Sequence, residues 1–343
     1  MEEAGRHVTQ RNGWAWCALA AVLFGSATPV IKLLVDEIGT VTLAGLLYLG
    51  AAVAVAPFAM REQRPRANRR QRSHLLVAVG LGGGLAPVLL VLALDRTPAG
   101  TVSLFLNLEL VATAVIARVF LQEHIGRRAG FGIVVVVLGG VILAGTSAAA
   151  VAVGALLVVA TCVCWGIDNA ITASLDSYSP SQITLAKGVV AGSVNLLFGL
   201  FLHAAPPARF VVAALAIGAI GYGVSITMWI TGARLVGATR GQVLFALAPF
   251  VGALLAWPIN GDRPAGTTMI AFVVSLAGVI VVALGDHTHV HTHDPVEHAH
   301  PLDPSDSHHC PEVIEVLGGN LHRHRSLRHD HDHLPDIHHR HTH

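Results

Sequence analysis

The residues with the most recognisable chemistry are histidines gathered at the C-terminal end of the chain. Residues 286–343 hold 17 of the 21 histidines, many of them in His-x-His or His-His pairs. A neutral imidazole binds zinc, nickel, cobalt and copper ions. Because the pairs are interleaved with Asp, Thr and Arg, they predict many overlapping sites of two or three ligands rather than one tetrahedral cage. The candidate metal ligands are His287, His289, His291, His293, His298, His300, His338, His339, His341 and His343.

The segment that carries these histidines is rich in proline and charge, so we expect it to be largely disordered. Three roles for this tail stay open. It could collect zinc, nickel or cobalt and deliver the metal to a transport path. Metal or proton occupancy could instead regulate the transport of another cargo. The third interpretation is a passive buffer or an interaction segment.

A second candidate for chemistry is Glu109, a carboxyl group in the middle of an apolar stretch. A charge at the centre of a bilayer costs about 2.5–3.5 kcal/mol on insertion scales. Glu109 should therefore face the protein interior, carry a proton or have a partner. One interpretation is a carboxylate that couples protons or binds a cation. The alternative is a structural carboxyl group that is hydrogen-bonded to a neighbouring helix.

Asp168 and Lys187 form a predicted ion pair within the membrane. Each lies about six residues from the predicted end of its helix, and a rise of about 1.5 Å per residue puts both at a similar depth. The pair is interpreted either as a substrate-linked gate or as a structural clamp, with Lys187 alternatively extending to the interface. Further candidates for substrate contact, for which helix–helix hydrogen bonding is an equal alternative, are Asn107, Asn169, Tyr222 and Gln242.

The elements that must position these residues are membrane helices. Hydrophobic residues make up 53% of the chain and charged residues 13%, whereas ordinary soluble domains have about 25% charged residues. Apolar runs of about twenty residues, the length that crosses a bilayer core, recur along the chain. We therefore expect an all-α integral membrane protein with ten transmembrane helices, at residues 13–34, 39–60, 74–94, 97–121, 128–146, 151–173, 181–203, 209–233, 239–259 and 264–285.

Arginine placement predicts the orientation of these helices. The loop at residues 61–72 carries six arginines, so the positive-inside rule places it in the cytoplasm. With ten spans, the N-terminus and the histidine tail then share the cytoplasmic side of a bacterial-type inner membrane.

The membrane part contains an internal repeat with an offset of about 140 residues. Leu104-Phe105, for example, matches Leu244-Phe245. Five helices per copy is an odd number, so the second copy should enter the membrane inverted, as in many secondary transporters. The predicted organisation is a cytoplasmic N-terminus at 1–12, repeats at 13–146 and 151–285, and the tail at 286–343.

Short motifs recur in the two halves. They are Phe24-Gly25 and Trp165-Gly166 in the first helix of each half, Pro98-Ala99-Gly100-Thr101 and Gly237-Ala238-Thr239-Arg240 in the fourth, and Thr184-Leu185-Ala186-Lys187 in the second half. With these motifs, residues 13–285 resemble the EamA-type family of the drug/metabolite transporter superfamily. The resemblance implies two inverted five-helix repeats and the export of small metabolites, driven by proton exchange or by the substrate gradient.

The first half departs from this pattern. Gly45 stands where the second half has Lys187, and Pro249 stands opposite Glu109. The two halves should therefore contribute unequally to a site. Small residues four apart are expected to allow close helix approach, at Gly80 with Gly84 and at Gly188 with Gly192.

Together these features favour a secondary exporter of a small metabolite or drug-like solute, with a metal-binding tail. The alternatives are a transition-metal efflux protein and a membrane-anchored metal sensor or store. Motifs of proteases, hydrolases and ATP-driven pumps are missing from the sequence, so we expect no enzyme activity and no required cofactor. The expected partners are a small-molecule substrate, the lipid bilayer and divalent metals at the tail, without nucleic acid. The sequence leaves a homodimer open.

Overall fold

The computed structural model divides the chain into two units, residues 1–285 and residues 286–343. They are described separately below. The structure describes residues 2–120, 126–145, 149–172, 174–236 and 238–284 of the first unit, and 288–293, 297–299, 314–318, 321–324 and 327–332 of the second.

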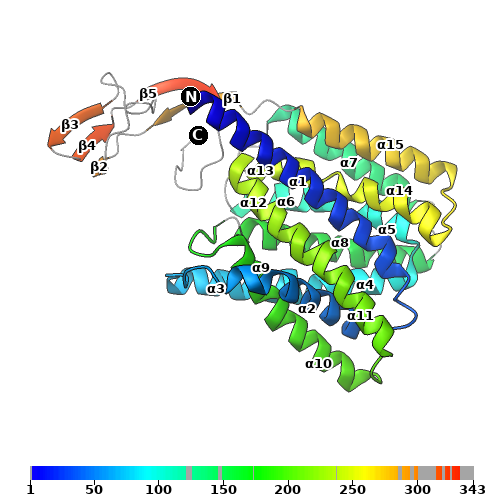
Figure 1. The fold of residues 1–343 in the computed structure, drawn as a ribbon. Helices are drawn as coiled ribbons and strands as arrows, with labels where there is room; N and C mark the ends of the chain where they lie inside the picture. The colour runs from blue at the N-terminus through cyan, green and yellow to red at the C-terminus, as the bar shows by residue number, and fades with distance from the viewer. Residues whose placement is uncertain are drawn as a thin grey trace. The chain divides into compact units, whose positions relative to one another are not determined.

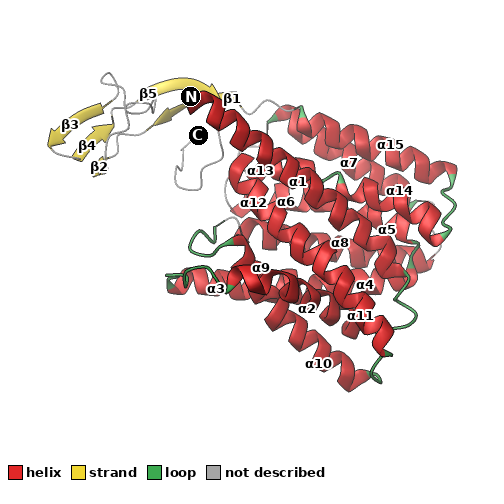
Figure 2. Ribbon diagram, in the orientation of Figure 1, coloured by secondary structure: helices red, strands yellow, loops and turns green. Residues whose placement is uncertain are grey.

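The first unit is a bundle of helices (Figures 1 and 2). Its first half comprises α1 (Glu2–Lys32), α2 (Thr40–Ala59), α3 (Arg69–Ala78), the π-helix η1 (Val79–Leu85), α4 (Ala86–Arg96), α5 (Ala99–Phe105), α6 (Leu108–Phe120) and α7 (Arg127–Ala144). Its second half comprises α8 (Ala149–Thr172), α9 (Pro180–Ala186), η2 (Lys187–Ala191), α10 (Gly192–Leu202), α11 (Ala208–Ile217), η3 (Gly218–Val224), α12 (Ser225–Val236), α13 (Ala238–Phe245), α14 (Ala248–Asn260) and α15 (Gly266–Ala283).

These elements join into ten segments, within the described residues, that are long and apolar enough to cross a bilayer. They are Asn12–Lys32, Thr40–Ala59, Arg69–Arg96, Ala99–Ile116, Arg127–Ala144, Ala152–Thr172, Pro180–Leu202, Ala208–Val236, Gly241–Asn260 and Gly266–Ala283. The ten predicted spans are confirmed, and no boundary differs by more than five residues. The segments are called spans 1 to 10 below.

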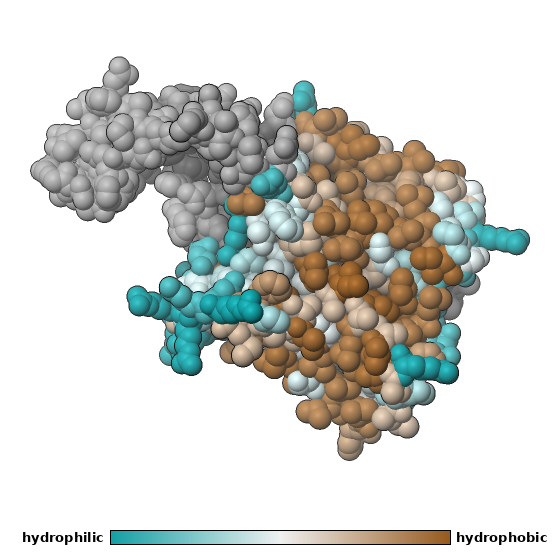
Figure 3. All heavy atoms as spheres, viewed as in Figure 1, coloured by the Kyte–Doolittle hydropathy of each residue, from teal (hydrophilic) through white to brown (hydrophobic). Residues whose placement is uncertain are grey.

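The surface of the first unit fits an apolar surrounding. Apolar residues cover the middle of the face shown in Figure 3, and hydrophilic residues gather at its two ends. Large side chains such as Val53, Phe201 and Val273 are at least 60% exposed. A water-soluble protein rarely exposes apolar patches this extensive, whereas a protein with ten spans buries such a surface in lipid. The chain is therefore a multi-pass membrane protein.

The internal repeat appears as matching irregularities in the helices. Span 4 is interrupted between Phe105 and Leu108, and span 9 is interrupted between Phe245 and Ala248. The two interruptions lie 140 residues apart, as the sequence repeat predicts. Spans 3 and 8 each contain a seven-residue π-helix, η1 and η3. The interruption of span 4 was not identified from the sequence, because apolar periodicity does not reveal a break that both flanking helices tolerate.

The glycines of the Phe24-Gly25 and Trp165-Gly166 motifs let the halves interlock. A Cβ atom at Gly25 would clash with the carbonyl oxygen of Ala248, in span 9. A Cβ atom at Gly166 would lie 3.0 Å from the backbone nitrogen of Thr113, in span 4. The first helix of each half thus packs against the fourth helix of the other half, and only glycine allows these approaches.

Glycine also sets the contact between α2 and span 7. A Cβ at Gly188 would lie 2.6 Å from the Tyr48 carbonyl oxygen, and one at Gly192 would lie 2.9 Å from the Leu49 nitrogen. The predicted close approach at Gly188 and Gly192 is confirmed. Gly45 faces the same contact, because a Cβ there would clash with the backbone of Leu196.

The corresponding prediction for Gly80 and Gly84 is wrong. A Cβ at Gly80 would meet nothing within 4 Å, and one at Gly84 would lie 3.6 Å from the Val79 carbonyl oxygen. The close approach in η1 occurs at Gly82 instead, where a Cβ would clash with the carboxylate of Asp168. The π-helix changes the angular spacing of residues, so the four-residue spacing no longer selects the face in contact.

The second unit contains five short strands, β1 (Thr288–His293), β2 (Glu297–Ala299), β3 (Ile314–Gly318), β4 (Leu321–His324) and β5 (Leu327–Asp332). β1 pairs with β5, and β2, β4 and β3 form a three-stranded sheet. The expectation that the tail is largely disordered stays a prediction. Thr, Val and Ile at β1 and β3 favour an extended backbone.

The glycine contact at α2 makes a direct prediction about stability. Gly45→Ala should lower the free energy of unfolding by about 1–3 kcal/mol, because the added methyl group meets a backbone that cannot move aside. The measurement is the midpoint of thermal unfolding of the purified protein in detergent. Gly80→Ala is the matched control, and it should leave the midpoint unchanged or slightly raised, since its Cβ enters open space. Equal losses in both variants would contradict the contact.

Candidate functional site

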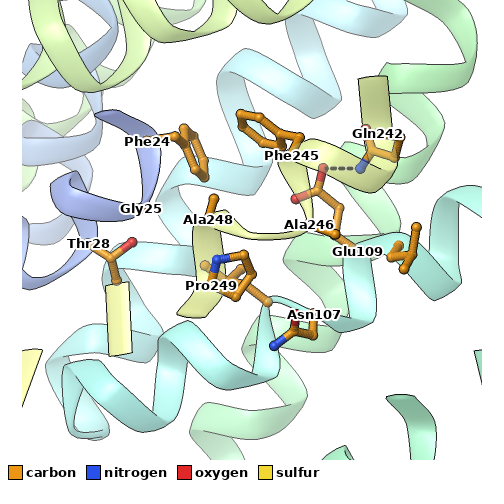
Figure 4. Close-up of a pocket in the computed structure, with 12 residues that line it drawn as sticks. Phe24, Gly25, Thr28, Asn107, Glu109, Gln242, Phe245, Ala246, Ala248 and Pro249 are labelled. Atoms are coloured by element: carbon orange, nitrogen blue, oxygen red, sulfur yellow. Dashed lines mark hydrogen bonds between the residues drawn. The ribbon is translucent and has the colours of Figure 1, made fainter. Parts of the chain in front are cut away.

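A buried pocket lies where the interruptions of spans 4 and 9 meet α1 (Figure 4). Its lining combines one carboxyl group, two amides and several apolar side chains, contributed by both halves. The lining residues are Phe24, Gly25, Thr28, Leu106, Asn107, Glu109, Leu110, Gln242, Phe245, Ala246, Ala248 and Pro249.

Glu109 is held in this pocket by amide groups from the second half. Asn169 Nδ2 donates a hydrogen bond to Glu109 Oε1 at 2.8 Å, and Gln242 Nε2 approaches the same oxygen at 3.5 Å. Figure 4 shows Gln242 and Glu109 directed toward one another. The Glu109 side chain is 8% exposed. Hydrogen bonds to a charged group contribute about 1.5–3 kcal/mol, so these amides offset part of the cost of burying a carboxylate.

The helix interruption explains why a carboxyl group stands at this depth. Glu109 lies in the first turn of α6, directly after the break at Leu106 and Asn107. The N-terminus of a helix carries partial positive charge, which favours a nearby negative charge. Pro249 takes the equivalent place in the first turn of α14. The second half therefore begins its helix without a carboxylate, and the predicted inequality of the halves is present in the site.

Two amide oxygens beside Glu109 have no hydrogen-bond partner within the described residues. They are Asn107 Oδ1 and Gln242 Oε1, both buried. The Asn107 amide nitrogen donates to the Leu104 carbonyl oxygen at 3.0 Å, which fixes that side chain at the break. An unpaired buried polar group costs about 1–3 kcal/mol. Two hydrogen-bond acceptors in this pocket therefore have no donor among the described residues, whereas the Glu109 carboxyl group accepts from Asn169 and Gln242.

An aromatic cluster forms the apolar side of the pocket. The Phe24 ring centroid lies 5.5 Å from that of Trp165, 5.4 Å from Tyr222 and 5.2 Å from Phe245. Tyr222, a candidate for substrate contact, packs against Phe24 and is 1% exposed. Sequence reasoning missed Phe24 and Phe245 as site residues. The recurrence of Phe24 at the position of Trp165 was a signal that could have identified the first of them.

Asp168 and Lys187 form the predicted ion pair next to this site. Lys187 Nζ lies 2.6 Å from Asp168 Oδ1 and 2.7 Å from Oδ2, with 4% and 8% of the two side chains exposed. Thr172 Oγ1 donates to Asp168 Oδ1 at 3.1 Å. Asp168 precedes Asn169 on α8, so one helix turn carries both the ion pair and a ligand of Glu109. The pairing is confirmed, with both partners buried.

The carbonyl of Gly82, in η1, connects this cluster to the first half. It accepts hydrogen bonds from Tyr48 Oη at 2.7 Å and from Trp165 Nε1 at 3.1 Å. A π-helix leaves carbonyl groups outside the regular ladder. Sequence reasoning also did not identify Gly82 as a neighbour of Asp168.

The structure brings Asn107, Glu109, Asn169 and Gln242 together and places Asp168 and Lys187 beside them. The predicted metal ligands belong to the other unit. Their backbone positions are described for His289, His291 and His293 in β1 and for His298 in β2, whereas His287, His300, His338, His339, His341 and His343 lie outside the described residues. Among the described residues of the helical unit, no three His, Cys, Asp or Glu side chains meet in a group that could hold a metal ion.

The pocket is narrow in this structure. Its free space is about 20 Å³, which accommodates about one water molecule. Contacts between the halves lie at both ends of the helices. At one end, Ser181 Oγ donates to Glu62 Oε2 at 2.8 Å. At the other end, the Gly100 nitrogen donates to Asp262 Oδ2 at 3.1 Å and Asn260 Nδ2 donates to the Pro29 carbonyl oxygen at 3.1 Å.

Comparison with known proteins supports this arrangement. An uncharacterized transporter of Methanothermobacter thermautotrophicus is 26% identical over 305 residues, which cover 82% of this chain and 88% of that protein. A probable terminal-alkyne amino-acid exporter of Streptantibioticus cattleyicolor is 26% identical over 277 residues, covering 78% of this chain and 92% of the relative. A crystal structure with 19% sequence identity has the same fold, with a TM-score of 0.58 over 81% of this chain and 98% of that chain.

The two halves each match one copy of the same family pattern. The EamA-like transporter family matches residues 11–145 and again residues 152–284. These ranges correspond to the two five-helix repeats predicted from the sequence, and together they include every residue of the pocket. The chain belongs to the EamA-like transporter family.

Proposed function

We propose that this protein is a secondary transporter that exports a small organic solute carrying an amino group, of the size of an amino acid. The observation that carries the proposal is the buried carboxyl group of Glu109, in a pocket that both halves line. A protonated amine supplies a positive charge opposite Glu109 and the N–H donors that Asn107 Oδ1 and Gln242 Oε1 lack. Phe24, Phe245 and Pro249 suit the apolar part of such a solute. The amino-acid exporter among the relatives supports the same class.

The mechanism that we propose is alternating access between the inverted halves. The pocket lies between them, and the contacts at Glu62 and at Asp262 close it at opposite ends. Opening to either side requires that one set of contacts separates while the other holds. Glu109 exchanges a proton for the solute, because the same carboxylate cannot serve both at once. The arginine-rich loop at 61–72 favours a cytoplasmic N-terminus and tail in a bacterial-type inner membrane.

The Asp168–Lys187 pair serves this cycle as a clamp rather than as a gate. A gate separates parts that move apart, whereas Asp168 and Lys187 lie on consecutive spans of the same half. Burial of both charges, with Thr172 as a further ligand, favours a permanent contact. The clamp fixes α8 and thereby the position of Asn169 against Glu109.

Metal efflux is the second candidate, and the pocket disfavours it. Transition-metal sites use several convergent histidine, cysteine or carboxylate ligands. The pocket offers one carboxylate, with amides around it. An organic amine needs only the groups that are present there.

The first prediction concerns coupling at Glu109. Glu109→Gln keeps the size of the side chain but removes its charge and its exchangeable proton. In proteoliposomes loaded with the twenty standard amino acids, an imposed pH gradient should drive efflux of at least one of them, read by mass spectrometry. Because hydrogen bonds to charged groups contribute about 1.5–3 kcal/mol, the variant should lose about tenfold or more of that efflux.

The matched control is Glu37→Gln, the same substitution at an exposed carboxylate. It should leave efflux unchanged. Full activity in Glu109→Gln would exclude Glu109 as the coupling group. Efflux of no amino acid by the native chain, with intact reconstitution, would overturn the substrate class.

A second prediction separates clamp from gate. Lys187→Ala should destabilise the protein by about 3–5 kcal/mol, because it leaves Asp168 charged, buried and alone. Adding Asp168→Ala should restore much of the thermal stability, since the uncompensated charge is then gone. The measurements are the unfolding midpoint and amino-acid efflux of each variant. A double variant that is stable but inactive would favour the gate.

A third prediction tests metal as the cargo. Cells that express the native chain, a chain truncated after Gly285 or Glu109→Gln should contain no less zinc, nickel or cobalt than cells without the protein, read by mass spectrometry. The native chain should hold equal or more metal in the cell, through its tail. A native chain that lowers one metal while both variants fail to do so would establish metal efflux instead.

A further inference from the structure

The strands β1 and β5 of the tail form an antiparallel ribbon whose register aligns histidines with histidines. His289 lies opposite His331, and His291 lies opposite His329. The two strands are separated by more than thirty residues of sequence. The alignment is therefore a property of the pairing and not of any local His-x-His motif.

Strand geometry sorts these positions onto one face of the ribbon. Alternate residues of a strand share a face, and so do residues directly opposite each other in an antiparallel pair. Positions 289, 291, 329 and 331 consequently share one face. The other face takes Val290 opposite Asp330 and Thr288 opposite Asp332.

The spacing on this face suits a single metal ion. Opposed positions have Cβ atoms about 4.5–5.5 Å apart, and positions two apart along a strand are about 6.6 Å apart. The register therefore places four histidine positions together on one face, and zinc in proteins typically takes four ligands. Neutral imidazole suits zinc, nickel, cobalt and copper, and four nitrogen ligands in a tetrahedron suit zinc most closely.

We propose that His289, His291, His329 and His331 bind one divalent transition metal, zinc by preference, on one face of the β1–β5 ribbon. This site would be the tightest in the tail, because the register brings four histidine positions together, whereas a single His-x-His segment supplies two. The remaining histidines add weaker sites of two ligands. The site does not depend on the proposed transport activity, and it can be present whether or not the helical unit moves an amine.

The test measures metal binding by the purified full-length protein. Zinc is titrated in competition with a chromophoric chelator, and cobalt is titrated with its visible absorption as a reporter of tetrahedral coordination. One variant replaces the β1 pair, His289→Thr with His291→Thr, and a second replaces the β5 pair, His329→Thr with His331→Thr. Threonine binds metal poorly but keeps a high preference for strands.

Each pair substitution should weaken the tightest zinc site by about tenfold or more, since loss of even supporting residues costs metal sites about 10–100-fold. Each should also abolish the tetrahedral cobalt spectrum. The matched control is His339→Thr with His341→Thr, which has the same His-x-His spacing outside β1 and β5. It should leave the tightest site and the spectrum intact.

A further variant tests the ribbon without removing any ligand. Val290→Pro keeps all 17 tail histidines but removes an N–H group from β1 and disfavours a paired strand. It should weaken the tightest site as the pair substitutions do.

Three outcomes would overturn the proposal. Equal losses in all three pair variants would mean a pool of equivalent histidines. A loss for the β1 pair without a loss for the β5 pair would mean a local His-x-His site. Retention of the tightest site in Val290→Pro would mean that the strand pairing is not required. Gel filtration of each variant verifies that the helical unit remains intact, since the substitutions lie outside it.

Discussion

The structure depends on the requirement that polar groups inside a membrane be satisfied by the protein itself, because the bilayer core offers no water. At the interruptions of spans 4 and 9 the backbone closes tight turns, in which Glu109 N donates to the Leu106 carbonyl oxygen and Phe250 N donates to the Leu247 carbonyl oxygen. The positive end of α6 makes a favourable place for a carboxylate, and Glu109 occupies it. Asn169 and Gln242 then supply the hydrogen bonds that the carboxylate requires. The pocket is a consequence of these interruptions rather than a separate addition to the bundle.

Close packing through glycine holds the two halves in the arrangement that forms this pocket. Gly25 and Gly166 bring the first helix of each half against the fourth helix of the other. Without a hydrophobic driving force between helices in lipid, such close approaches supply much of the packing energy. The same repeated unit therefore builds both sides of the site, while single differences such as Glu109 against Pro249 make the sides chemically distinct. Because only the first half has a carboxylate at this position, the pocket between the two similar halves contains one carboxylate.

In the tail, strand pairing rather than helix packing determines which residues lie together. Its histidines could contribute only weak, interchangeable sites if the chain were extended and unpaired. Antiparallel pairing of β1 with β5 converts two distant His-x-His segments into four aligned positions. The membrane pocket, with one carboxylate and several amides, has fewer metal ligands than a transition-metal site uses. The two proposals therefore assign an organic solute to the membrane pocket and a metal ion to the second unit.

The sequence by itself determined the ten spans, the repeat, the family and the pairing of Asp168 with Lys187. These follow from hydrophobic length, from a constant offset and from charges at equal depth, which are properties of single segments or of their spacing. Only the tertiary structure decided that span 4 is interrupted at Asn107, that Phe24 and Phe245 line the pocket, and that Gly82 rather than Gly80 approaches its neighbour. It also decided the register of β1 against β5. A helix break, a π-helix or a strand partner depends on what packs against the segment, and the residues that do so are far away in the chain.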